Sequence, residues 1–98
     1  MEFKIVIRKA FERKFEDTVD YIGEHFGEKA ALKFIKDLES KTERLLENPE
    51  LGRPSLRMKE VRKIKVGKHN SVFYTLKFNK IVLLDLFDQR QNLSKSKY

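Results

Sequence analysis

The sequence predicts an α+β domain in the order β-α-α-β-β-β, with a two-helix hairpin packed on one face of an antiparallel sheet. Two observations carry this prediction. Apolar and polar residues alternate near the start and in the second half of the chain, whereas between these segments apolar residues recur every three or four positions. The first spacing is typical of strands and the second of amphipathic helices. A sheet with both helices on one face buries all of these apolar stripes.

The first half of the chain contains the first strand and the helical hairpin. Phe3, Ile5 and Ile7 share one face of a short strand. The first helix has its apolar stripe at Phe11, Phe15, Val19, Ile22 and Phe26. Gly27 is placed to end it. The second helix has its stripe at Ala31, Phe34, Ile35, Leu38, Thr42 and Leu45. Asn48-Pro49 stops it, because proline disfavours helical geometry in the residue before it.

The second half predicts a loop over residues 51–56 and then three strands. Lys63 and Lys65 alternate with Ile64 and Val66, and residues 67–70 form a hairpin turn. The next strand places on one face Val72, Tyr74, Leu76 and Phe78. This parity makes Tyr74 a core residue. After a turn at Asn79-Lys80, residues 81–87 are apolar on both faces, which indicates a central strand. Residues 89–98 form a polar tail, and the whole chain of 98 residues is one domain.

The composition excludes several classes of protein. There is no cysteine, no apolar run near the ~20 residues of a membrane span, and too short an apolar N-terminus for a signal peptide. We therefore expect a cytoplasmic protein with no membrane contact. Phosphate-binding glycine loops and Gly-x-Ser-x-Gly motifs are missing, and only His25 and His69 are histidines. Neither a cofactor nor a metal site is expected.

The positive charge is concentrated in one segment. The chain has a net charge of +7, yet residues 53–80 alone carry nine Lys or Arg against Glu60. Such a block predicts an electropositive face that attracts a nucleic acid or an acidic protein. The alternative is an ordinary solvated surface.

Lys63 and Lys65 share strand parity and point to the same sheet face, where Arg90 could join them from the end of the last strand. Such a face suits a polyanion and could cleave RNA without a metal, because cations stabilise the pentavalent phosphate while a Lys, Tyr or His moves protons. If the protein is a nuclease, the candidate catalytic residues are Lys63, Lys65 and Arg90. The candidate target-binding residues are Arg57, Arg62, Lys63, Lys65, His69, Arg90 and Tyr98.

The chain resembles the RelE/ParE toxins over nearly its whole length. The element order carries this resemblance, together with the segments Leu46-x-Asn48-Pro49-x-x-Gly52, Val61-Arg62-Lys63-Ile64-x-Val66, Phe73-Tyr74 and Asp88-x-Arg90-Gln91-Asn92. The resemblance implies a growth-inhibiting toxin of a type II toxin–antitoxin system. It also implies a cognate antitoxin protein that wraps the toxin, giving a hetero-oligomer.

The resemblance leaves two targets open. RelE-like members cut mRNA in the ribosomal decoding site, whereas ParE-like members inhibit DNA gyrase with no established nuclease chemistry. Lys63, Lys65 and Arg90 match the nuclease branch. Ser71 and Ser96 stand where that branch has an Arg and a Tyr, and the two long helices look closer to ParE. We therefore favour the ParE-like interpretation. A basic RNA- or protein-binding module without toxicity, and a degenerate member that retains only antitoxin binding, are further alternatives.

Overall fold

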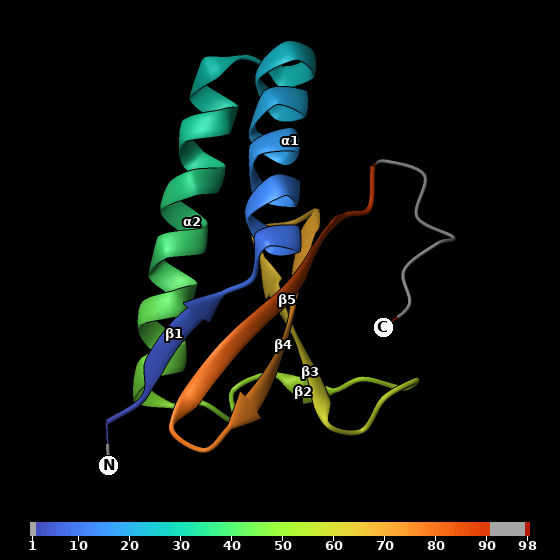
Figure 1. Cartoon of the computed structure of the whole chain (residues 1–98). Coiled ribbons are helices and arrows are strands. Elements are labelled where there is room, and N and C mark those ends of the chain that lie inside the picture. Colours follow the sequence, from blue (N-terminus) through green and yellow to red (C-terminus); the bar gives the residue numbers. More distant parts are fainter. Residues whose placement is uncertain (1, 91–97) are drawn as a thin grey trace.

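Two helices and five strands make up the computed structural model, which describes residues 2–90 and 98. The helices lie side by side and cover one face of the sheet (Figure 1). The predicted α+β fold is confirmed. In chain order the elements are β1 (Lys4–Ile7), α1 (Lys9–Phe26), α2 (Glu28–Glu47), β2 (Arg53–Pro54), β3 (Val61–Val66), β4 (Asn70–Lys77) and β5 (Lys80–Asp88).

The sheet differs from the prediction in two ways. Its strand order is β1-β5-β4-β3-β2, in which β2 to β5 are antiparallel but β1 pairs with β5 in parallel. The helical hairpin returns the chain to the end of the sheet where β1 began, and the meander then brings β5 up in the direction of β1 (Figure 1). The two-residue β2 lies in the predicted loop. The prediction that β5 is central is confirmed.

The core lies between the helices and the sheet face turned toward them. Both predicted helical stripes contribute, with Phe11, Ile22 and Leu45 at most 2% exposed. From the sheet come Ile64, Val66, Val72, Tyr74, Ile81, Leu83 and Leu86. The predicted core position of Tyr74 is confirmed, since it is fully buried. No helix of the described residues is long and apolar enough to cross a membrane.

The turns follow the prediction at Gly27 and depart from it at Phe78. Gly27 has a φ of 95° and separates the helices, a conformation that L side chains rarely adopt. Phe78 was expected on the apolar face of its strand. The structure instead places it in the β4–β5 turn, with a φ of 57° and 91% of its surface exposed. The strand ends at Lys77, so the alternation no longer governs the next residue.

Tyr74 explains why a glycine follows the Asn48-Pro49 stop. Its hydroxyl donates to the carbonyl oxygen of Pro49 and accepts from the Gly52 amide, both at 2.8 Å. A Cβ on Gly52 would lie 2.7 Å from that hydroxyl oxygen and 2.9 Å from the Lys63 carbonyl oxygen. Burial raises the pKa of Tyr74, although the Gly52 amide opposes this. The chain leaving α2 is thereby fixed against the sheet, and this fixes the start of the loop carrying β2.

Candidate functional site

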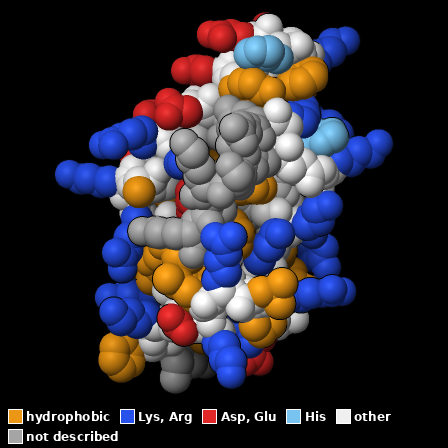
Figure 2. Space-filling model, turned by 90° about the vertical axis from the view of Figure 1, so that its right-hand side faces the viewer, with side chains coloured by type: hydrophobic (Ala, Val, Ile, Leu, Met, Phe, Trp, Pro, Cys, Tyr) orange, Lys and Arg blue, Asp and Glu red, His pale blue; other side chains and the backbone are white. Residues whose placement is uncertain are grey.

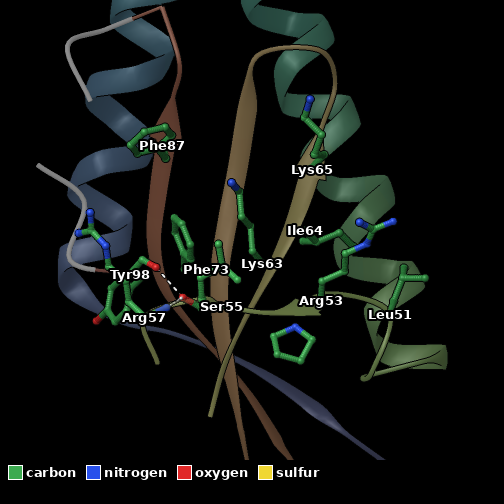
Figure 3. Close-up of a pocket in the computed structure, with 12 residues that line it drawn as sticks. Leu51, Arg53, Ser55, Arg57, Lys63, Ile64, Lys65, Phe73, Phe87 and Tyr98 are labelled. Carbon is green, nitrogen blue, oxygen red and sulfur yellow. Dashed lines mark hydrogen bonds between the residues drawn. The ribbon is translucent and has the colours of Figure 1, made fainter. Parts of the chain in front are cut away.

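A cleft of about 880 Å³ lies on the sheet face opposite the helices, which we call the outer face. Lys63 and Lys65 are exposed on this face while Ile64 and Val66 are buried on the other, as their parity predicted. The cleft also takes in the loop around β2 (Figure 3). Its lining comprises Leu51, Arg53, Pro54, Ser55, Leu56, Arg57, Lys63, Ile64, Lys65, Phe73, Phe87 and Tyr98. We call this the outer cleft.

The floor of the outer cleft is aromatic. Phe73 pairs with Lys63 across β3 and β4, and the Lys63 Nζ lies 5.9 Å from the centre of the Phe73 ring. The ring of Phe87 meets that of Phe73 edge-on at 6.4 Å. Tyr98 also packs against Phe73, with ring centres 5.5 Å apart. A floor of aromatic rings beside ammonium groups offers a partner both stacking and charge.

Ser55 connects the β2 loop to Tyr98. Its hydroxyl donates to the Tyr98 carbonyl oxygen, and the Arg57 amide donates to the same hydroxyl oxygen at 3.2 Å (Figure 3). Ser55 is buried, and its own amide bonds the Val61 carbonyl at 2.7 Å. These contacts bring Arg57 and Tyr98 to the cleft that holds Lys63 and Lys65. Four of the seven predicted target-binding residues thus surround one site.

The outer cleft is strongly electropositive. Lys and Arg side chains flank a band of apolar ones on this side of the molecule (Figure 2). Within residues 2–90 and 98, none of the four salt bridges involves Arg53, Lys63 or Lys65. Their charges therefore remain available to an anionic partner.

Arg90 lies elsewhere. Its Nε and Nη2 donate to the two carboxylate oxygens of Asp88 at 3.0 and 2.7 Å, and its guanidinium stacks 4.3 Å from the ring centre of Phe26 in α1. It is therefore held on the helix side of the sheet, and the structure does not bring it to Lys63 and Lys65. The predicted tail residues 91–97, including Ser96, lie outside the described residues.

The Asp88–Arg90 ion pair joins a fully buried carboxylate to a guanidinium that is 23% exposed. Asp88 is 1% exposed, and it also accepts from the Arg90 amide at 2.8 Å and from Asn70 Nδ2 at 3.2 Å. Burial alone would raise the pKa of Asp88, but the hydrogen bonds and charge of Arg90 outweigh it and lower the pKa. The same bonds to Asp88 raise the pKa of Arg90.

Arg62 and His69 also stand apart from the outer cleft. Arg62 Nη1 donates to the Gly52 carbonyl at 2.6 Å and the Glu50 carbonyl at 3.2 Å, so it braces the loop after α2. His69 lies in the β3–β4 turn, where its carbonyl accepts from the Gln89 amide at 2.8 Å. Both residues are half-buried.

Sequence reasoning missed four important residues of the outer cleft, namely Arg53, Ser55, Phe73 and Phe87. A signal was present for Phe73, because it is a large aromatic at the outward parity between Val72 and Tyr74. Ser55 gave none, since its role comes from the fold of the loop. Among the described residues, no three His, Cys, Asp or Glu lie together as metal ligands would.

Comparisons with known proteins agree with this fold. Residues 5–93 match the family described as the ParE toxin of type II toxin–antitoxin system, parDE. No curated protein sequence gives a significant match. A solved structure of the chromosomal ParDE toxin–antitoxin system from P. aeruginosa is similar at a TM-score of 0.77 and 19% identity, covering 89% of this chain and 96% of that one.

Two other solved structures share the fold at greater distance. A mutant toxin from Helicobacter pylori has a TM-score of 0.65 and 17% identity, covering 91% of this chain and 97% of its own. YafQ from E. coli has a TM-score of 0.61 and 14% identity, with 91% and 96% covered. The family match extends over nearly the whole chain, from β1 to beyond β5. The chain belongs to the ParE toxin family of type II toxin–antitoxin systems.

Proposed function

We propose that this toxin stops growth by binding DNA gyrase through the outer cleft, without cutting RNA. The observation that carries the proposal is the position of Arg90. The nuclease branch carries an Arg after its last strand, and a guanidinium at the scissile phosphate would stabilise the charge that develops there. In this chain the matching residue is Arg90, whose guanidinium donates two hydrogen bonds to Asp88 and packs on Phe26, on the helix side of the sheet.

Ser71, near the start of β4, also supports the proposal that the protein does not cut RNA. Ser71 stands where the nuclease branch has an Arg, and it is buried at 6% exposure. The outer cleft therefore keeps cations that can bind a partner, chiefly Arg53, Lys63 and Lys65. It has no guanidinium from either of the two positions at which the nuclease branch carries one. A binding surface for an acidic region of a protein needs only the first set.

Purified toxin should test this proposal against two targets in parallel. We expect inhibition of supercoiling by gyrase and no cleavage of mRNA on ribosomes. Arg90→Lys keeps the charge but loses the two-bond grip on Asp88, so we expect a graded loss of inhibition that follows the loss of folded protein. Codon-proximal mRNA cuts by the wild type, reduced about 10²-fold in Arg90→Lys, would instead establish the nuclease mechanism.

We further propose that the cytoplasmic antitoxin covers β1 and the groove beside it. An apolar groove of about 470 Å³ separates β1 from the two helices, and among its lining are Ile7, Phe11, Phe15 and Ile35. β1 is an edge strand, whereas the opposite edge strand β2 has two residues, one of them Pro54. An added strand pairs with β1 more readily, because proline lacks an amide hydrogen.

Two matched substitutions test the place of the antitoxin. Ile7 and Leu32 are equally exposed, at 53% and 52%, but only Ile7 lines the groove. Co-expression with the product of the adjacent gene should restore growth and yield a co-purifying complex. Ile7→Glu should weaken that complex and Leu32→Glu should leave it intact. Equal effects of the two substitutions would place the antitoxin elsewhere.

A further inference from the structure

The β4–β5 turn presents an aromatic ring to solvent at a backbone position that suits glycine. Phe78 is 91% exposed, and its φ of 57° is one that bulky residues adopt only at a cost. It is the one non-glycine residue with positive φ among the described residues. Neither burial nor turn geometry explains a phenylalanine here, because Gly or Asn would form the same turn with less strain.

Three lysines lie at the ends of the strands next to this turn. Lys77 pairs with Lys80 across β4 and β5, and Lys80 pairs in turn with Lys4 of β1. Their neighbours Leu76, Ile81 and Ile5 belong to the core, so alternation places all three lysines on the outer face. The turn lies at one end of the sheet beside the start of β1 (Figure 1). We call Lys4, Lys77, Phe78 and Lys80 the hairpin-tip site.

Folding does not account for this row of like charges. Like charges directly opposite one another destabilise a sheet. The salt bridges of residues 2–90 and 98 involve none of the three lysines. Adjacent strands hold their Cα atoms about 5 Å apart, which keeps three ammonium groups within reach of one polyanion. The hairpin-tip site therefore combines destabilising charge with a strained, exposed ring, as binding sites do.

We propose that the hairpin-tip site binds duplex DNA, with the three lysines on backbone phosphates and the Phe78 ring inserted at a base step. Phosphates attract closely spaced lysines, and apolar side chains such as Phe enter between base pairs in proteins that kink DNA. A membrane surface fits less well, because interfacial binding needs a broad apolar face and the turn carries Phe78 between Lys77 and Asn79. The proposal does not depend on gyrase as the target, because none of these residues lines the outer cleft.

Phe78→Gly isolates the ring without endangering the fold. Glycine accepts positive φ, so the thermal midpoint should stay equal or rise. Binding of the full-length protein to a fluorescein-labelled 30-base-pair duplex should weaken about tenfold, since stacking of a base on an aromatic ring has roughly this value. A duplex containing 2-aminopurine should brighten with the wild type, because the ring unstacks the base, and should stay dim with Phe78→Gly.

The lysines are tested by the salt dependence of binding. Replacing Lys4, Lys77 and Lys80 by Gln should reduce the slope of log affinity against log salt concentration by about 3, close to one unit for each lost phosphate contact. The matched control replaces Lys29, Lys36 and Lys41 of α2 by Gln, with the same change in net charge. This control should leave the slope nearly unchanged.

Three results would overturn the proposal. Equal slopes in the two triple variants would reduce the binding to overall charge. Unaltered duplex affinity in Phe78→Gly would remove the ring from the site. Binding of the wild type to phosphatidylserine vesicles that Phe78→Gly abolishes, with duplex affinity unchanged, would assign the ring to a membrane instead.

Discussion

The cations on the two faces of the sheet have opposite surroundings. Toward the helices, Arg90 is bound to the buried carboxylate of Asp88, and at the edge of the sheet Arg62 donates to the carbonyls of Glu50 and Gly52. On the outer face, Lys63 and Lys65 are exposed and form none of the salt bridges among the described residues. The basic residues of β3 and of the chain after β5 therefore divide into those that hold the fold together and those that can meet a partner. A basic residue takes the structural role where hydrogen-bond acceptors of the fold lie within reach of its side chain.

The largest expected effect comes from removing the carboxylate that accepts from Arg90. In Asp88→Ala a half-buried guanidinium loses its carboxylate, and Asn70 loses its acceptor. The free energy of unfolding should fall by about 3 kcal/mol, because the partly buried guanidinium is left without the carboxylate that balances its charge. Urea denaturation measures this. Asp37→Ala is the control, since its exposed pair with Lys33 should contribute less than about 0.5 kcal/mol. Equal losses in both variants would contradict a structural role for the Asp88–Arg90 pair.

The second effect concerns the clamp that holds the loop of the outer cleft. Tyr74→Phe removes the hydroxyl that bonds Pro49 and Gly52, leaving a buried amide and a carbonyl without this partner. We expect a loss of about 2 kcal/mol in unfolding free energy. Tyr21→Phe is the matched control, because the Tyr21 hydroxyl makes no hydrogen bond within residues 2–90 and 98. A stable Tyr74→Phe would show that packing alone holds the loop.

The third effect is smaller, because protonation removes the charge of Asp88 but leaves the carboxyl group in place. Its lowered pKa means that the folded state favours the ionised form. This contribution to stability is fully present above the unfolded pKa of about 3.9 and is lost as the pH falls through the lower folded pKa. Thermal midpoints between pH 6 and pH 2 should therefore fall less steeply in Asp88→Asn than in the wild type. Identical pH profiles would exclude the pair as a source of acid sensitivity.

The same comparison shows what the sequence could predict. Alternation placed Lys63 and Lys65 outward and Tyr74 inward, because period-two spacing needs only local geometry. It could not place Arg90, whose side chain follows a bond to its neighbour Asp88 rather than the direction of the strand. The prediction for Phe78 was wrong because β4 ends at Lys77, one residue before the apolar alternation ends. The parallel β1–β5 pair depends on how the helical hairpin returns the chain, and no local spacing records that.

The sequence predicted only part of the outer cleft, because local spacing relates residues of one strand but not residues of separate segments. Lys63 and Lys65 were found as a pair, since both belong to one strand. Arg53, Ser55 and Phe87 reach the cleft from other segments, which the sheet order and the β2 loop bring together. The sequence placed Gly52 in a family motif but did not show why a glycine is needed there. Only the structure shows that the Tyr74 hydroxyl occupies the space of its missing Cβ.

The smallest expected effect on stability is at the two exposed lysines of the outer cleft. Replacing Lys63 and Lys65 together by Ala removes two exposed charges, and substitutions at such positions seldom change unfolding free energy by more than about 0.5 kcal/mol each. If the outer cleft binds the target, growth inhibition should nevertheless be weakened. The control is Lys29→Ala with Lys36→Ala on α2, which changes net charge equally and should leave toxicity intact. Urea denaturation and growth after induced expression measure the two properties separately.

Asp88→Ala should weaken both stability and toxicity, whereas the Lys63 and Lys65 variant should weaken only toxicity, because its charges face a partner rather than the fold. Full toxicity in the folded double variant would make the outer face a solvated surface.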